Sequence, residues 1–276
     1  MSENENKEVD TGLKSTTGSD SMSKLAKDIS MALVTKPAIS MLEIFLPSYV
    51  TDEINEYLEE RRKELPSFAQ ELVGQIKTHK DSAQLDMDIK NHAQPKGLAT
   101  LCEGFCQTYL QTQGIQVATP KCVSMWSVHS YEGDYNPLHD HGLKSIMGMS
   151  MILYLKVPPQ IEKLPGSVSD FESGSHKLTL NDATGQTDGF TFFSWGAHGS
   201  QDLRMGRCVQ EAFVKPEVGK LLMFPNWLKH GVSPFYGEGE RRTLSANFEI
   251  ETSQASIIND TKQYILGKPR GARTQT

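Results

Sequence analysis

The stretch Tyr131–Gly142, YEGDYNPLHDHG, is the segment around which the rest of the chain is organised. Its glycine, asparagine and proline residues make it rich in turns, and it ends in two histidines separated by one residue. Side chains two residues apart on an extended backbone point to the same side. His139 and His141 are therefore predicted to converge on one point while Asp140 points elsewhere. Two imidazoles on one side of a strand end supply two of the three ligands of a facial metal site.

The third ligand has to come from a distant part of the chain. His230 is the favoured candidate because it follows the apolar run KLLMF and a Pro-Asn turn, and begins the next predicted strand. Such a return brings its side chain back to the same end of a β-sandwich. The other candidate ligands are His129, His176 and His198 downstream and His79 and His92 upstream. Of these, the three downstream histidines are expected to be hydrogen-bonded or solvent-facing.

A polar pattern on the last predicted strand suggests an anion site. Within ERRTLSANF, one face carries Arg241, Thr243, Ser245 and Asn247, and the other carries Leu244, Ala246 and Phe248. A guanidinium and a hydroxyl two residues apart can hold a carboxylate, the former through two parallel hydrogen bonds. Tyr154, in MILYL, can offer a phenol to the same anion from a neighbouring strand. Arg242 has the opposite parity and is expected to be structural.

Composition narrows the class of protein. A chain of 276 residues with 37% hydrophobic and 22% charged residues is typical of a globular protein, and a net charge of −6 without a basic run argues against nucleic-acid or anionic-membrane partners. No apolar run approaches the ~18 residues of a membrane span, and Met1–Lys36 lacks a signal-peptide core, so we expect a cytoplasmic protein. Its four cysteines contain no CxxC pair and are expected to be reduced and buried.

The order of predicted elements is helices first and short strands later. Residues 1–36 are polar and predicted to be a mobile tail. Residues 37–276 are predicted to form a single domain, in which residues 37–115 provide helical support and residues 116–255 form a β core. Residues 158–216, which are rich in glycine, are expected to form insertion loops over one end of it.

Individual elements follow from periodicity and turn residues. We predict a strand over Ile39–Leu46, a helix capped by Thr51, a second helical stretch over Phe68–Ile76, and the clearest helix over Gly97–Gly114. The predicted strands are Cys122–Val128, Met147–Val157, Thr191–Phe193, Lys220–Phe224 and Thr243–Glu251. Helices followed by many short strands favour a mainly β fold in which helices support an antiparallel sandwich or barrel.

Taken together, these motifs resemble the 2-oxoglutarate- and Fe(II)-dependent oxygenases, in particular the prolyl-4-hydroxylase-like bacterial or phage-type branch. The matching pieces lie within residues 122–250: a strand with Trp126, the loop GDYNPLHDHG, a strand ending ILYL, FPNWLKHGVSPF, and ERRTLSANF. The resemblance implies a double-stranded β-helix (jelly roll, cupin-like) and hydroxylation driven by O2 and coupled to oxidative decarboxylation of 2-oxoglutarate to succinate. It assigns Fe(II) to His139 and His230, and the C5 carboxylate of 2-oxoglutarate to Arg241 and Thr243, assisted by Tyr154. The prime substrate, whether peptide side chain or small molecule, and the oligomeric state are left open.

One position departs from the family pattern. The usual ligand set is HxD or HxE with a distal histidine, and this chain has His141 where the carboxylate belongs. We predict that His141 binds the metal at the position of this carboxylate, which leaves one more positive charge on the metal centre. Two alternatives stay open: a cupin-type metal dioxygenase or isomerase, and a non-catalytic module in which metal only staples the sandwich. The cupin pattern requires a glutamate four or five residues after His141, where this chain has Ser145 and Ile146. A complete carboxylate-binding site would favour the oxygenase over both the cupin-type enzyme and the structural metal site.

Overall fold

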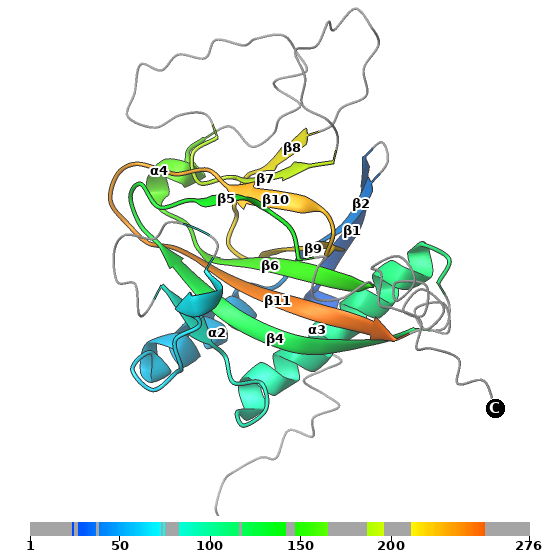
Figure 1. The fold of residues 1–276 in the computed structure, drawn as a ribbon. Coiled ribbons are helices and arrows are strands. Elements are labelled where there is room, and N and C mark those ends of the chain that lie inside the picture. Colours follow the sequence, from blue (N-terminus) through cyan, green and yellow to red (C-terminus); the bar gives the residue numbers. More distant parts are fainter. Residues whose placement is uncertain are drawn as a thin grey trace, which may run out of the picture.

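The computed structural model describes residues 24, 27–36, 39–72, 74, 83–115, 118–141, 147–164, 187–195 and 211–251. Its strands form two antiparallel sheets that face each other, with two long helices beneath the larger sheet (Figure 1). The larger sheet has the order β1-β2-β9-β6-β11-β4-β3, and the smaller has β5-β10-β7-β8. The prediction of a mainly β, jelly-roll fold with flanking helices is confirmed.

The strands of the larger sheet are β1 (Ser30–Lys36), β2 (Ile39–Phe45), β3 (Gln84–Asp86), β4 (Thr119–Ser130), β6 (Gly148–Lys156), β9 (Lys220–Pro225) and β11 (Arg241–Glu251). Those of the smaller sheet are β5 (Asn136–His139), β7 (Thr191–Ser194), β8 (Glu211–Val214) and β10 (Lys229–Val232). The helices are α2 (Ser48–Arg61), α3 (Ala93–Thr112) and α4 (Pro159–Glu162), with a single 3-10 turn over Ala69–Glu71.

The larger sheet is buried on both faces because it lies between the helices and the smaller sheet. One core cluster joins α3 residues such as Cys106 and Phe105 to the sheet face of Leu244 and Phe248. A second cluster, between the two sheets, contains Tyr154, Phe193, Phe224 and Leu228 among others. Burial on both faces explains why β6 reads as a continuous apolar run instead of an alternating one. The polar face of β11 therefore lies inside the sandwich.

Several predicted boundaries were wrong. The tail prediction over residues 1–36 included Ser30–Lys36, which pairs with β2 along its whole length. The helix α2 begins after Pro47, and Thr51 lies inside it, donating from its hydroxyl to the Ser48 carbonyl at 2.8 Å instead of capping the end. Helix α3 begins four residues before Gly97 because Pro95 is tolerated in the first turn, where backbone N–H groups have no helical partner.

Other segments differ in kind from their predictions. The stretch predicted as helical over Phe68–Ile76 contains only the short 3-10 turn among its described residues. Within the expected insertion loops of residues 158–216, the described parts include α4, β7 and β8, and the two strands form one side of the smaller sheet. The predicted stop of α3 at Gly114 is confirmed by its positive φ of 82°.

Candidate metal centre

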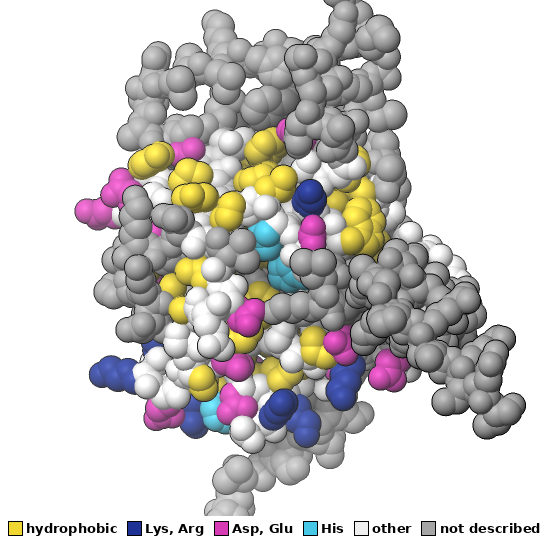
Figure 2. Space-filling view, in the orientation of Figure 1, with side chains coloured by type: hydrophobic (Ala, Val, Ile, Leu, Met, Phe, Trp, Pro, Cys, Tyr) yellow, Lys and Arg dark blue, Asp and Glu magenta, His cyan; other side chains and the backbone are white. Residues whose placement is uncertain are grey.

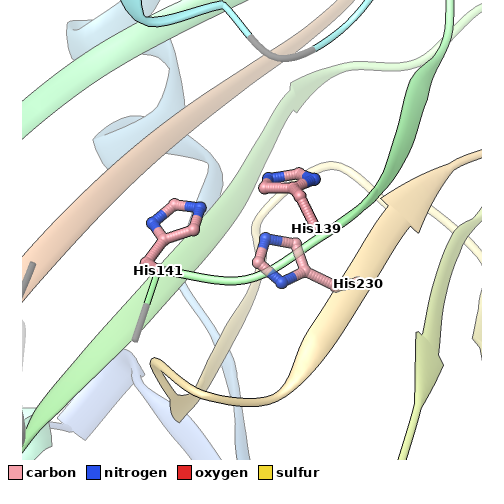
Figure 3. Close-up of side chains that lie close together, drawn as sticks. All are labelled: His139, His141 and His230. Carbon is pink, nitrogen blue, oxygen red and sulfur yellow. The ribbon is translucent and has the colours of Figure 1, made fainter. Parts of the chain in front are cut away.

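The ladder between β5 and β10 places two of the predicted ligands opposite each other. His139 pairs with His230 in antiparallel register, and their ring centroids lie 4.4 Å apart. His230 is buried, whereas His139 is half-buried. In Figure 3 both rings lie on the same side of the two strands and face the third imidazole. Long-range strand pairing has thus brought together two histidines that are far apart in the sequence.

His141 follows the end of β5 and completes the group. Its backbone N–H donates to the Asn226 carbonyl at 2.8 Å, which fixes the chain just beyond the strand. The His141 ring centroid lies 5.2 Å from that of His139 and 5.2 Å from that of His230. One nitrogen from each ring lies within 4.8 Å of the others, whereas Asp140 between the two HxH histidines is exposed. The described residues therefore bring together the three histidines that the sequence pattern predicted, and the intervening aspartate is not in the group.

Hydrogen bonds hold each imidazole in one tautomer. The Nδ1 atoms of His139 and His230 lie 2.8 Å and 3.0 Å from the carbonyl oxygens of Pro137 and Leu228, respectively. The Nδ1 atom of His141 lies 2.7 Å from Oδ1 of Asn247, which also accepts from the Ser150 hydroxyl at 3.1 Å. Because an oxygen acceptor requires an N–H donor, each Nδ1 carries the proton and each Nε2 keeps its lone pair. This arrangement is typical of metal-binding histidines, whose second nitrogen donates to an oxygen acceptor.

Burial also favours the neutral form of two of the imidazoles. Burial lowers the pKa of His139. The pKa of His230 lies well below its usual value because the ring is buried and lies near the other two histidines, His139 and His141. Neutral imidazole is the form that binds metal, and Fe, Zn, Ni and Cu all accept nitrogen ligands of this kind. Three ligands on one side leave further positions open to a chelating molecule. The residues present therefore fit an iron centre.

Arg241 lies in the same cavity without a carboxylate partner among the described residues. Its side chain is fully buried; Nε donates to the Gly189 carbonyl at 2.8 Å and Nη2 donates to the Thr191 hydroxyl at 3.3 Å. Burial lowers its pKa, yet an arginine remains charged in proteins. A buried charge is costly unless it is paired. The guanidinium is therefore suited to an incoming anion.

The other two predicted carboxylate-binding residues differ in position. Thr243 lines the cavity two residues along β11, as its parity predicted. Tyr154 instead lies against the guanidinium, with Arg241 Cζ 5.4 Å from its ring centroid, and its hydroxyl donates to Thr191 at 2.7 Å. Thr191 was missed because a single threonine at the start of a short strand carries no sequence signal. It accepts hydrogen bonds from both Tyr154 and Arg241, and so holds them together.

Two side chains left outside the predicted site are structural. Arg242 is buried and bonds Glu59 on α2 at 2.6 Å and Glu240 at 2.7 Å, in line with its opposite parity. His129 is buried between Ser127 and Glu240. Hydrogen bonds from His129 and Arg242 outweigh the effect of burial and lower the pKa of Glu240 to about 2.

The other candidate histidines do not join the group of three among the described residues. His92 contacts the Tyr57 hydroxyl. Outside the described residues lie His79, His176, His198 and the cupin positions 145 and 146.

Histidine side chains reach the surface of the molecule. Figure 2 shows them in the middle of this face, with both hydrophobic and charged side chains nearby. The cavity wall includes residues that the sequence did not single out as site residues, above all Gln84, Asn136 and Glu71.

No helix among the described residues is long and apolar enough to cross a membrane.

Comparisons with known proteins identify the family. Residues 124–247 match the family model described as "Putative 2OG-Fe(II) oxygenase". No curated protein is similar to the chain in sequence.

Similar solved structures include oxygenases from bacteria and a virus. A Pseudomonas putida prolyl-4-hydroxylase is 15% identical, with 82% of this chain and 95% of that chain covered and a TM-score of 0.46. The viral collagen prolyl hydroxylase of Paramecium Bursaria Chlorella virus-1 is 12% identical over 76% of this chain and 96% of that chain, with a TM-score of 0.40. HygX from Streptomyces hygroscopicus, with nickel and 2-oxoglutarate bound, is 12% identical over 75% and 81%, with a TM-score of 0.41.

The match spans β4 to β11, the part of the chain that carries the three clustered histidines and Arg241. The resemblance noted in the sequence is confirmed, and with it the cofactors of the family, Fe(II), 2-oxoglutarate and O2. Residues 124–247, the part of the chain that holds this site, are therefore similar to the 2-oxoglutarate- and Fe(II)-dependent oxygenases.

Proposed function

We propose that the chain is a 2-oxoglutarate-dependent hydroxylase whose iron is held by His139, His141 and His230. The observation that carries the proposal is the combination, in one cavity, of three Nε2 lone pairs and the buried Arg241, which has no carboxylate partner among the described residues. Iron and 2-oxoglutarate together supply O2 activation coupled to oxidative decarboxylation, with succinate and CO2 as products. The prime substrate in this proposal is a peptide side chain or a small molecule.

The spacing of the proposed ligands suits a five-carbon diacid. His230 pairs with Phe193 on β7, and Thr191, which bonds Arg241, lies two residues further along that strand. Two residues of strand correspond to about 7 Å. This offset is comparable with the length of an extended 2-oxoglutarate. In the proposal Arg241 grips the far carboxylate, Thr243 adds a hydrogen bond, and Tyr154 with Thr191 holds the guanidinium in place.

The position of His141 bears on the charge of the centre. A carboxylate ligand would remove one unit of positive charge, whereas three imidazoles remove none. The dianionic co-substrate then balances the metal charge by itself. A structural metal site is closed by protein ligands. A centre that needs the charge of a bound co-substrate therefore favours the oxygenase over a purely structural metal site.

The test is anaerobic titration of the protein with Fe(II) and then 2-oxoglutarate, followed by visible absorption. We expect a weak charge-transfer band only when both are present. His230→Ala should abolish iron binding. Arg241→Ala should leave metal content near normal and weaken 2-oxoglutarate binding by about 2–5 kcal/mol, which is more than tenfold.

The matched control is Arg61→Ala, at an exposed arginine on α2. Equal 2-oxoglutarate affinity in the Arg241 and Arg61 variants would refute the assigned carboxylate grip. Stoichiometric metal without the band would instead favour a cupin-type or structural site.

A further inference from the structure

The cavity of the metal centre extends away from Arg241 towards the edge of the larger sheet. Thr243 on β11 pairs with Val128 on β4, which pairs with Gln84 on β3. All three line the same cavity. The proposed co-substrate grip lies at β11, so the β4–β3 edge forms a separate wall, and this wall is free to contact a second molecule.

Two buried acceptors on this side lack hydrogen-bond partners. Gln84 is 4% exposed and its Oε1 is unpaired, while its backbone carbonyl is held by the Phe68 N–H at 2.9 Å. Asn136, on the facing strand β5, also has a buried, unpaired Oδ1. Buried polar atoms are nearly always satisfied in folded proteins, and an unmade hydrogen bond is costly. Both residues line the cavity, although Oδ1 of Asn136 lies close to Gly74; the unpaired oxygen of Gln84 indicates that a ligand supplies a missing donor.

An aromatic surface lies on the same wall. The Trp126 ring stacks on Phe68 with centroids 5.2 Å apart and an interplanar angle of 25°. Its distance to the His141 ring is 6.3 Å, at 23°. Trp126 therefore holds a fixed orientation beside the metal centre, because both Phe68 and His141 stack against its ring.

The charge of the wall disfavours an anion. Arg241 is the one lysine or arginine among the described residues that line the cavity, and the proposed function assigns it to 2-oxoglutarate. Glu71 contributes a carboxylate to the lining beside Gln84 and Trp126. Acceptors and a carboxylate together select a neutral or cationic donor.

We propose that the prime substrate presents a planar group rich in N–H donors, an amide or a guanidinium, to Gln84 and Asn136 beside Trp126. The inference rests on the proposed function and adds the chemical class of its second substrate. The planar group would lie at the β4–β3 edge, and the carbon to be oxidised would extend from it towards the three histidines.

The test uses protein loaded with Mn(II) and saturating 2-oxoglutarate, since Mn(II) broadens the proton signals of molecules bound nearby. The probes are N-methylacetamide, N-methylguanidinium, acetate and tert-butanol, with Zn(II)-loaded protein as the diamagnetic reference. We expect strong broadening of the two planar donors and little of acetate or tert-butanol. The stronger of the two planar probes distinguishes an amide from a guanidinium substrate.

Gln84→Leu should reduce that broadening about tenfold. The matched control Gln111→Leu, at an exposed glutamine on α3, should not change it. If Gln84→Leu does not fold, Asn136→Leu removes the second acceptor and should give the same loss. Equal broadening by acetate, or no change in the folded cavity variant, would overturn the proposal.

The anaerobic Fe(II) and 2-oxoglutarate band separates two kinds of failure. A normal band with unselective broadening would reject the substrate class alone. Absence of the band would reject the proposed function on which it rests.

Discussion

The hydrogen bond between His141 and Asn247 allows a sharp test of the metal centre, through the substitution Asn247→Leu. Asn247 Oδ1 accepts from His141 at 2.7 Å and from Ser150 at 3.1 Å, while its Nδ2 lies 3.4 Å from the Ser124 hydroxyl. Leucine has a similar volume but no acceptor. The His141 ring would keep its backbone anchor and lose the bond that fixes its tautomer and orientation.

The free-energy cost of Asn247→Leu can be bounded in two ways. Removing the acceptor and leaving the buried His141 N–H unpaired costs about 1–3 kcal/mol. Loss of an outer hydrogen bond to a metal-binding histidine typically weakens metal affinity about 10- to 100-fold, which corresponds to roughly 1.4–2.7 kcal/mol. Because only one of the three ligands is affected, we expect weaker binding and no complete loss.

The assay is an anaerobic competition titration of Fe(II) against a coloured chelator, with and without 2-oxoglutarate. Asn247→Asp keeps an acceptor at the same place and should bind metal much more tightly than the leucine variant. Ser124→Ala removes only the partner at the other end of the amide and serves as the control. Metal affinity within twofold of the unmodified protein for Asn247→Leu would contradict the role assigned to this hydrogen bond in holding His141 as a ligand.

Three further predictions concern packing, acid stability and thiols. Gly231→Ala would place a Cβ 2.5 Å from the Phe192 ring, so we expect a loss of about 1–3 kcal/mol in denaturant unfolding and weaker metal binding by the β5–β10 pair. The pKa of Glu240 is lowered to about 2, so the ionised carboxylate contributes on the order of 3 kcal/mol to the free energy of unfolding. This contribution is present above pH 4.5 and is lost as the pH falls towards 2. Glu240→Gln should therefore make the stability nearly independent of pH over that range, and an unchanged acid profile would contradict the pairing with Arg242. Burial raises the pKa of the thiols of Cys102, Cys106 and Cys122. Iodoacetamide at pH 8 should therefore label these thiols only after the protein is denatured. Rapid labelling of the native protein would contradict this prediction.

The fold was predictable where one periodicity dominated. The apolar face of α3 and the alternation on β11 are local patterns, and both predicted which side chains are buried. The strands that were missed, β3 and β8, have three and four residues, and too few side chains alternate in them to give a signal. Strand β1 forms a hairpin with the neighbouring β2, and it was missed because residues 1–36 were assigned together from the polar composition of the segment as a whole.

The site followed from parity on two strands. His139 and His141 share a side, and so do Arg241, Thr243 and Asn247, because alternate residues of a strand point the same way. Parity does not say which residues approach from another sheet. Thr191 on β7 and Asn136 on β5 reach the cavity region only through long-range strand pairing, so their sequence contexts carried no signal. Tyr154 was placed on the correct neighbouring strand, but it contacts the guanidinium instead of lining the cavity.

The electrostatics of the cavity connect the histidines to the arginine. All three imidazoles donate to uncharged acceptors, two backbone carbonyls and one amide, so the protein adds no negative charge to the metal centre through these bonds. Arg241 is likewise without a carboxylate partner among the described residues. Both positive groups in this buried cavity are left for an incoming molecule to neutralise, and the cost of burying them unpaired favours a dianion that reaches both. A dicarboxylate bound to only one of them would leave the other charge uncompensated. In the proposed function, His141 in place of a carboxylate increases the dependence of the centre on its co-substrate, because the charge that a protein ligand normally supplies would have to arrive with 2-oxoglutarate.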